Sequence, residues 1–263
     1  MLFAPYERFQ YARSPLVEVI CQLRFPTILS IGAREPADFQ EAIRREFPRY
    51  AARQEQLPPK LVKKETGPVL EPQKPLTNYH FISEDGRWKL NLTQNFIALS
   101  TLSYRRWEDF AARLDRPLAQ FIQIYQPAYF ERLGLRYLNA ISRKALGLED
   151  QLWDDLIQSQ YLGILGEPDV EESEITKCSL DVESPLVGGY RMKLHTGPGL
   201  IGDGKTDKEV KFILDGDFSA SGQLSADSAP EKLEQMHRFA VCFFRGAVTN
   251  TLHEAMGPTP LAE

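Results

Sequence analysis

The stretches that decide the fold read VEVICQLRF (Val17–Phe25) and RLGLRYLNAI (Arg132–Ile141). Both are rich in apolar, β-branched and aromatic residues, which is typical of a strand buried for most of its length. Both also contain leucine, arginine and an aromatic residue in succession, so Arg24 and Arg136 hold equivalent places 112 residues apart. This correspondence predicts that the chain repeats one structural unit.

The elements expected after each strand follow one order. Hydrophobic periodicity and turn residues predict, in the first half, a helix at 38–50, strands at 79–83, 88–92 and 96–102, and a long helix at 107–125. The same signals predict, in the second half, a helix at 149–159, strands near 175–183, 189–196 and 209–219, and a closing helix at 229–254.

The sequence therefore predicts an α+β protein with two pseudo-repeated lobes, residues 1–130 and 131–263. Each lobe reads strand, helix, three strands, helix, with a mainly antiparallel sheet and helices packed on one face. The second lobe is expected to pack tightly against the first, and joining them edge to edge would bury strand edges in one long curved sheet. The alternative is two similar but unrelated α+β modules, since the literal identity is short.

Residues 51–78 interrupt the first half. They are poor in apolar residues and contain five prolines: Pro58, Pro59, Pro68, Pro72 and Pro75. The segment is predicted to form a long exposed loop, and loops of this length are often functional.

Composition excludes several classes of protein. The net charge is −5 and the Lys and Arg residues are scattered among acids, so neither nucleic acid nor a membrane surface is an expected partner. The three cysteines show no CxxC spacing, which is typical of free thiols in a reducing compartment. The chain shows no signal-peptide pattern and no apolar run long enough to span a bilayer. We therefore expect a cytoplasmic protein.

One segment, GLIGDGKT, matches the phosphate-loop pattern G-x-x-x-x-G-K-[ST] through Gly199, Gly204, Lys205 and Thr206. That loop needs a strand before it and a helix after it. Here both flanking segments alternate as strands do, and only 57 residues remain after Thr206. A strand, glycine-rich loop and strand hairpin is therefore favoured over nucleotide binding at this loop.

No other motif in the sequence points to a metal site or a catalytic site. Asp215-Gly216-Asp217 lacks the further oxygen ligands of a calcium loop, and the four histidines lack metal-ligand spacing. No GxSxG motif and no adjacent cysteine and histidine occur. The sequence therefore names no catalytic residue, metal or cofactor, and it favours a protein that is not an enzyme.

The candidate binding residues are Arg24, Arg136, Tyr137 and Asn139. An arginine flanked by apolar residues must be paired or project into a cleft, because an unpaired buried guanidinium is costly. One interpretation is a pair of arginine forks that recognise an anion between the lobes. The other is two structural salt bridges, for example between Arg24 and a carboxylate of the other lobe.

The chain also resembles a sporadically distributed family of uncharacterised bacterial proteins of similar length. The similar segments are PLVEVICQLRFP (Pro15–Pro26), ERLGLRYLNAI (Glu131–Ile141), FILDGDF (Phe212–Phe218) and LEQMHRFAVCFFRGAVTNTLHEAMG (Leu233–Gly257). They span nearly the whole chain, and 51–78 and 197–208 fall outside them. The family has no established activity to carry over. Its patchy distribution is that of mobile or immunity genes, so the resemblance implies a role in defence.

Two functional hypotheses follow. The first is a non-enzymatic protein of the bacterial cytoplasm that acts through protein–protein contact, in a defence or toxin-neutralising system. The second is a sensor that binds a small ligand or nucleotide in a pocket between the lobes, lined by the four candidate residues. A nuclease or NTPase that uses carboxylates and Lys205 is a third, less supported hypothesis. The sequence identifies neither the partner nor the oligomeric state.

Overall fold

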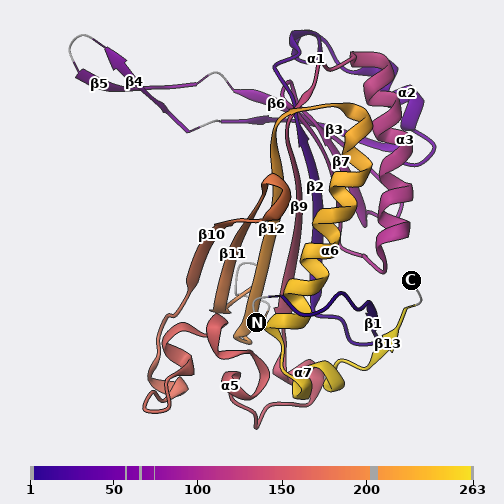
Figure 1. Cartoon of the computed structure of the whole chain (residues 1–263). Coiled ribbons are helices and arrows are strands. Elements are labelled where there is room, and N and C mark those ends of the chain that lie inside the picture. The colour runs from indigo at the N-terminus through magenta and orange to yellow at the C-terminus, as the bar shows by residue number, and fades with distance from the viewer. Residues whose placement is uncertain (1–2, 57, 65–66, 74, 202–206, 262–263) are drawn as a thin grey trace.

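A computed structural model describes residues 3–56, 58–64, 67–73, 75–201 and 207–261. Its centre is one nine-stranded sheet in which neighbouring strands run antiparallel (Figure 1). In spatial order the strands are β10 (Leu180–Pro185), β11 (Tyr190–Gly199), β12 (Lys211–Leu224), β9 (Phe130–Ile141), β2 (Leu16–Arg24), β8 (Phe96–Thr101), β7 (Trp88–Leu92), β6 (Leu76–Ile82) and β3 (Arg49–Glu55). Two further strand pairs join β1 (Phe9–Tyr11) to β13 (Pro258–Pro260) and β4 (Lys60–Lys64) to β5 (Gly67–Glu71).

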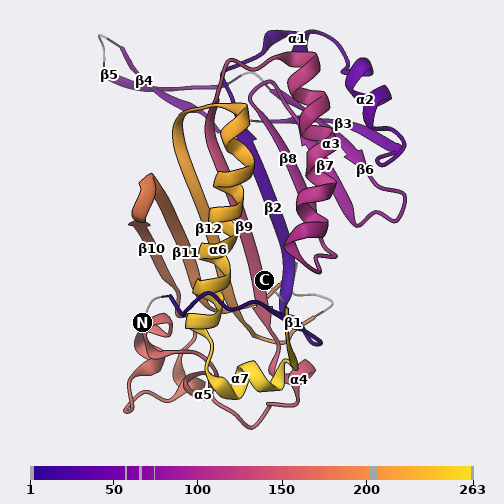
Figure 2. The ribbon, with the colours of Figure 1, turned by 45° about the vertical axis from the view of Figure 1, so that its right-hand side comes forward.

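Two long helices, α3 (Trp107–Tyr125) and α6 (Ala229–Ala247), lie side by side over one face of the sheet (Figures 1 and 2). The short helices are α1 (Leu29–Ala33), α2 (Ala37–Ile43), α4 (Arg143–Leu146), α5 (Trp153–Leu156) and α7 (Asn250–Ala255). Single 3₁₀ turns cover Ser159–Tyr161, Gly163–Gly166, Glu172–Glu174, Val187–Gly189 and Ala226–Ser228. The predicted α+β class with a mainly antiparallel sheet is confirmed. No helix in the described ranges is long and apolar enough to cross a membrane.

The pairing of β2 with β9 joins the two halves of the chain. β2 is hydrogen-bonded to β8 on its other side and β9 to β12, so one sheet runs through both halves. On the side of the helices Val19, Cys21 and Leu23 lie opposite Tyr137, Leu135 and Leu133, and all six are buried. Because side chains alternate along a strand, Arg24 and Arg136 point to the other face. A single core therefore extends across the predicted lobe boundary at residue 130.

Most of the described residues between 51 and 78 belong to strands and not to the predicted loop. β3 pairs with β6, and beyond them β4 pairs with β5 to form a hairpin that projects away from the body (Figures 1 and 2). The side chain of Gln56 donates to the carbonyl of Gln73 (3.1 Å), which links the two strands where the prolines interrupt the ladder. Both faces of this hairpin meet solvent, so its sequence lacks the apolar alternation from which a strand is predicted. We call residues 58–73 the arm.

Two predicted helices end early at one shared contact. Ile157 and Val248 form an isolated antiparallel bridge, and the amide of Gln158 donates to the carbonyl of Ala247 (2.9 Å). These extended residues limit the helix predicted at 149–159 to α5 and divide the closing helix into α6 and α7. Thr249 then caps α7, since its hydroxyl accepts from the amide of Leu252.

The orientation of β2 implies that substitutions at two adjacent residues should affect the free energy of unfolding very differently. Replacing Leu23, which is fully buried in the core, with alanine should lower the free energy of unfolding by about 2–5 kcal/mol. Arg24→Ala, one residue further along and exposed, should change it by less than about 0.5 kcal/mol. Urea unfolding of both variants measures the difference. A large loss of stability in Arg24→Ala together with a small loss in Leu23→Ala would show that the two faces of β2 have been assigned the wrong way round.

Candidate functional site

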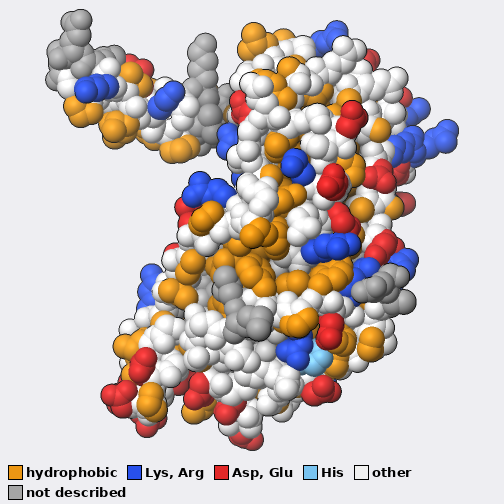
Figure 3. Space-filling view, in the orientation of Figure 1, with side chains coloured by type: hydrophobic (Ala, Val, Ile, Leu, Met, Phe, Trp, Pro, Cys, Tyr) orange, Lys and Arg blue, Asp and Glu red, His pale blue; other side chains and the backbone are white. Residues whose placement is uncertain are grey.

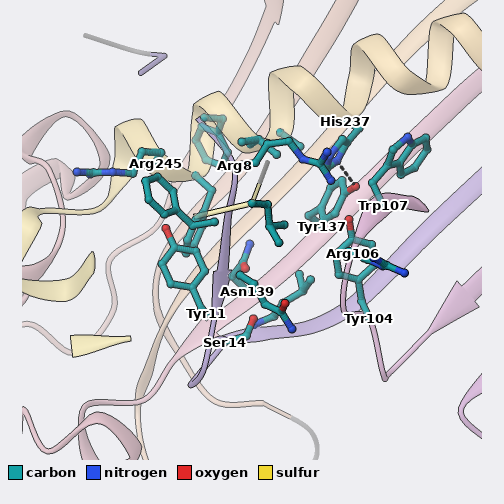
Figure 4. A pocket seen from close by; sticks show the side chains of 18 of the residues that line it. Arg8, Tyr11, Ser14, Tyr104, Arg106, Trp107, Tyr137, Asn139, His237 and Arg245 are labelled. Carbon is teal, nitrogen blue, oxygen red and sulfur yellow. Dashed lines mark hydrogen bonds between the residues drawn. The ribbon is translucent and has the colours of Figure 1, made fainter. Parts of the chain in front are cut away.

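A cavity of about 210 Å³ lies on the helix side of the sheet, where the two halves meet. Its walls come from α6, the beginning of α3, strand β9 and the N-terminal residues 7–16, which we call the strap. Figure 4 shows these side chains converging on one space from elements far apart in the sequence. The cavity is the natural candidate for a ligand site, because such sites are concave and combine apolar walls with a few polar groups.

Backbone and ionic contacts hold the strap over the cavity. Its residues in β1 pair with β13, and Arg8 forms an ion pair of 2.6 Å with Glu108 at the first turn of α3. At the start of β2 the register with β9 shifts by one residue, so that Leu16 lies opposite Asn139. Such a bulge redirects side chains locally, and both Leu16 and Asn139 line the cavity.

One wall is built around a buried histidine. The Nδ1 atom of His237, on α6, is 2.9 Å from the hydroxyl of Tyr137 on β9. The imidazole stacks on the indole of Trp107, with ring centroids 4.9 Å apart and planes 9° from parallel. His237 is 4% exposed and Trp107 is 7% exposed. Three elements thus fix the position of this ring.

Burial keeps this pair uncharged. Loss of water around the imidazole, reinforced by the positive charge of Arg8, lowers the pKa of His237 to about 3. Burial likewise raises the pKa of the Tyr137 hydroxyl well above its usual value. With Nδ1 bonded to Tyr137, the buried Nε2 atom has no hydrogen-bond partner among the described residues. In either neutral tautomer Nε2 offers one unused donor or acceptor, which is a costly state for a buried polar atom.

The opposite wall is aromatic as well. Tyr11 of the strap packs edge-on against Phe244 of α6, with centroids 5.8 Å apart. The Tyr11 hydroxyl is 3.0 Å from Nδ1 of His253 on α7. Burial raises the pKa of Tyr11 to about 12, so the hydroxyl stays protonated at neutral pH. This wall therefore presents apolar ring surface to the cavity.

The charged residues around the cavity are mostly positive. Its lining includes Arg8, Arg105, Arg106 and Arg245 but a single acid, Glu7. Arg8 and Arg106 are paired with Glu108 and Asp109, respectively. Arg105 is exposed and makes no ion pair with another described residue. The site thus combines apolar walls, an unused buried nitrogen and an excess of guanidinium groups.

The four residues predicted from the sequence do not line one pocket. Tyr137 and Asn139 line the cavity, and the amide of Asn139 donates to the carbonyl of Leu214 (3.2 Å). Arg24 and Arg136 lie on the opposite face of the sheet, because alternate residues of a strand point to opposite sides. The prediction that all four residues line one pocket is therefore wrong for Arg24 and Arg136.

On that opposite face the two arginines differ. Arg136 makes a bidentate pair with Asp215, with nitrogen–oxygen distances of 2.7 and 2.5 Å. This hydrogen bonding raises the pKa of Arg136. Arg24 lies opposite Arg132 in the ladder, and its side chain makes no ion pair or hydrogen bond with the part of the chain that the structure describes. Arg132 is itself held by Asp217, at 2.7 and 2.8 Å.

The phosphate-loop pattern falls between two antiparallel strands. β11 ends at Gly199 and pairs through it with Lys211 at the start of β12, as the predicted hairpin requires. Gly204, Lys205 and Thr206 lie outside the described residues. The strand before the pattern is thus followed by a strand, where a phosphate loop would have a helix.

Sequence reasoning missed the central residue of the site, although a signal for it exists. His237 follows Leu233 by four residues and precedes Ala240 by three, so it lies within the apolar stripe of the closing helix. A polar side chain in such a stripe must find a buried partner. The strap gave no comparable signal, since its position over the cavity depends on contacts with residues near the other end of the chain.

The pKa of His237 predicts how stability depends on pH. The folded pKa of about 3 lies below the usual value of 6.5, so the unfolded chain takes up this proton first as the pH falls. Stability present above about pH 6.5 is therefore lost progressively toward pH 3. Between pH 7 and 5 this residue should account for a loss of about 2 kcal/mol in the free energy of unfolding.

Urea unfolding at the two pH values tests this. The loss should be about 2 kcal/mol smaller in His237→Phe than in the wild type. Leu233→Ala, on the same buried face of α6, removes no titratable group and should keep the wild-type dependence. An identical loss in His237→Phe and the wild type would contradict a neutral buried His237.

Comparisons with known proteins assign no identity to this geometry. No family model matches the chain, and no curated protein matches it either. Within the described ranges no three His, Cys, Asp or Glu side chains gather as metal ligands do. The candidate site therefore rests on its own chemistry, which is that of a binding cavity.

Proposed function

We propose that this protein is a non-enzymatic binding protein whose cavity takes a small amphipathic molecule with an acidic group. The observation that carries the proposal is that His237 lines the cavity and that its buried Nε2 atom has no hydrogen-bond partner among the described residues. A carboxylate, phosphate or carbonyl oxygen of a ligand would accept a hydrogen bond from it in the tautomer whose Nδ1 accepts from Tyr137. This bond would relieve the cost of the unused nitrogen.

The rest of the lining supports the same class of ligand. The rings of Trp107, Tyr11 and Phe244 favour an apolar body. The excess of arginines over acids favours a negative group on it, and the free guanidinium of Arg105 is the cation best able to pair with that group. A volume of about 210 Å³ fits a molecule with a body the size of a medium-length alkyl chain or a small ring system.

A second function is favoured by a different part of the molecule. The arm projects from the body and exposes Leu61 and Leu70, which are directly opposite each other in the ladder. Exposed apolar residues grouped on a projecting element are typical of a protein–protein contact. Contact with a protein partner through the arm is therefore our second proposal. The role in defence or toxin neutralisation that the resemblance implies stays a prediction.

The internal duplication also remains a proposal. The strand order supports it, since β2 pairs with β8 and β9 pairs with β12, each the last strand that its half contributes to the large sheet. Superposition of residues 16–125 on residues 130–247 should therefore bring α3 onto α6. If no single superposition brings both the helices and the strands of the two halves together, a common origin of the halves is contradicted.

Calorimetry with three eight-carbon probes tests the cavity. Octanoate should bind more tightly than octanol by about tenfold, because a charge-assisted hydrogen bond contributes about 1.5–3 kcal/mol. Octylammonium should bind more weakly than either, because the arginines repel its charge. Thermal melts should show the same order, since a ligand that binds the folded state raises its stability.

Matched variants locate the binding. His237→Phe and Arg105→Ala should each reduce the preference for octanoate over octanol. Arg24→Ala, which removes an equally exposed arginine from the other face of the sheet, should leave it unchanged. Equal binding of all three probes, or a preference that His237→Phe leaves intact, would reject the proposed anion site.

A further inference from the structure

The arm presents two uncovered leucines on one face. Leu61 is 66% exposed and Leu70 is 65% exposed, and they pair directly across β4 and β5. Lys63, two residues from Leu61 in the same strand, is exposed and points to the same face. A two-stranded hairpin is at best marginally stable alone in water. An arm of this kind therefore gains stability when another surface covers its leucines.

The charge of the arm restricts which surface can do so. Residues 58–73 contain three lysines and two glutamates, and the side chains of Lys60 and Lys63 are exposed. In Figure 3 the arm shows basic and hydrophobic side chains together. Two arms packed face to face would bring like charges together, which is unfavourable. The complementary surface should be acidic and should also expose apolar side chains.

The opposite end of the same molecule has these properties. Residues 145–176 contain no lysine or arginine, and all their acids except Glu172 are exposed. We call this segment the acidic end, and Figure 3 shows its red side chains gathered at the bottom of the view. The acids are Glu149, Asp150, Asp154, Asp155, Glu167, Asp169, Glu171, Glu172 and Glu174.

Apolar side chains are exposed within the acidic end. Leu152 and Ile164 are each 53% exposed. Leu152 directly precedes α5, and α5 contacts the 3₁₀ turn Gly163–Gly166 that holds Ile164. The acidic end thus repeats the pattern of the arm, a pair of exposed aliphatic residues beside charges, with the opposite sign of charge.

We infer that the arm of one molecule docks on the acidic end of a second copy of this chain. The leucines of the arm would cover Leu152 and Ile164, and Lys63, on the same face as the leucines, would lie among the surrounding carboxylates. Because the arm and the acidic end lie at opposite ends of the molecule (Figure 1), the contact is head-to-tail. Repetition of such a contact gives a ring or a filament. This inference rests on the second proposed function, protein contact through the arm.

Charge reversal tests the contact by sedimentation. The weight-average mass of the wild type should rise above the 30.0 kDa of one chain as its concentration increases in low salt. High salt should lower it again, because exposed charges are screened. Lys60→Glu/Lys63→Glu on the arm should weaken self-association by at least about tenfold, and so should Asp154→Lys/Glu167→Lys on the acidic end.

Mixing the two double variants is the decisive measurement. Each variant alone lacks either an unchanged arm or an unchanged acidic end, whereas in the mixture the unchanged arm of one variant can dock on the unchanged acidic end of the other. The mixture should therefore associate although neither component does. Arg34→Glu/Arg45→Glu, at exposed arginines near α1 and α2, serves as the matched control and should associate as the wild type does. Circular dichroism melts verify that all the variants are folded.

The outcomes separate the two proposals. A wild type that stays at the mass of one chain at high concentration in low salt overturns the contact between copies. Self-association that the arm variant does not weaken overturns the arm as the docking element, and the second proposed function with it. A mixture that stays monomeric while the wild type associates overturns the assignment of the acidic end. Octanoate binding is independent of all three results.

Discussion

The pairing of β2 with β9 is the contact on which the rest of the structure depends. It is the one ladder in the large sheet that joins the two halves of the chain, and its helix-side residues are buried. Every backbone polar group along these buried strands needs a partner, and the ladder supplies it. The pairing also sets α3 and α6 side by side, because each helix packs on the strands of its own half. Without it, the strands β8 to β3 and β12 to β10 would be separate sheets with exposed edges.

The cavity follows from this arrangement. Its floor is β9 beside the bulged start of β2, its walls are the ends of the two long helices, and its cover is the strap. His237 occupies the point where these elements meet, bonded to Tyr137 and stacked on Trp107. Buried polar atoms are usually hydrogen-bonded, although His80 Nε2 and Arg113 Nε, away from the cavity, also lack a partner among the described residues. The proposed binding site therefore rests on the combination of the unused Nε2 with apolar walls and several guanidinium groups.

The parts of the fold that were predicted correctly are those with a strong local pattern. The helix at 107–125 agrees with α3 to the residue, because its apolar stripe is complete within the segment. The strands of the large sheet also agree in type and order, except for β3, which falls where the end of a helix and the start of a loop were predicted. The prediction failed where the deciding partner is distant in sequence. Ile157 and Val248 are 91 residues apart, and their bridge ends two helices that periodicity alone would continue. The arm failed for a different reason, since a ribbon exposed on both faces has no apolar alternation.

The sequence by itself determined the fold class, every strand of the large sheet except β3, and the two long helices, because these depend on the spacing of apolar residues along the chain. It also brought Tyr137 and Asn139 forward as site residues. Only the tertiary structure decided that Arg24 and Arg136 face away from them, since the face of a strand that meets the helices depends on packing. It alone decided that the strap covers the cavity and that His237 is left with an unused nitrogen. These features arise from contacts between residues far apart in sequence, and no local pattern encodes such contacts.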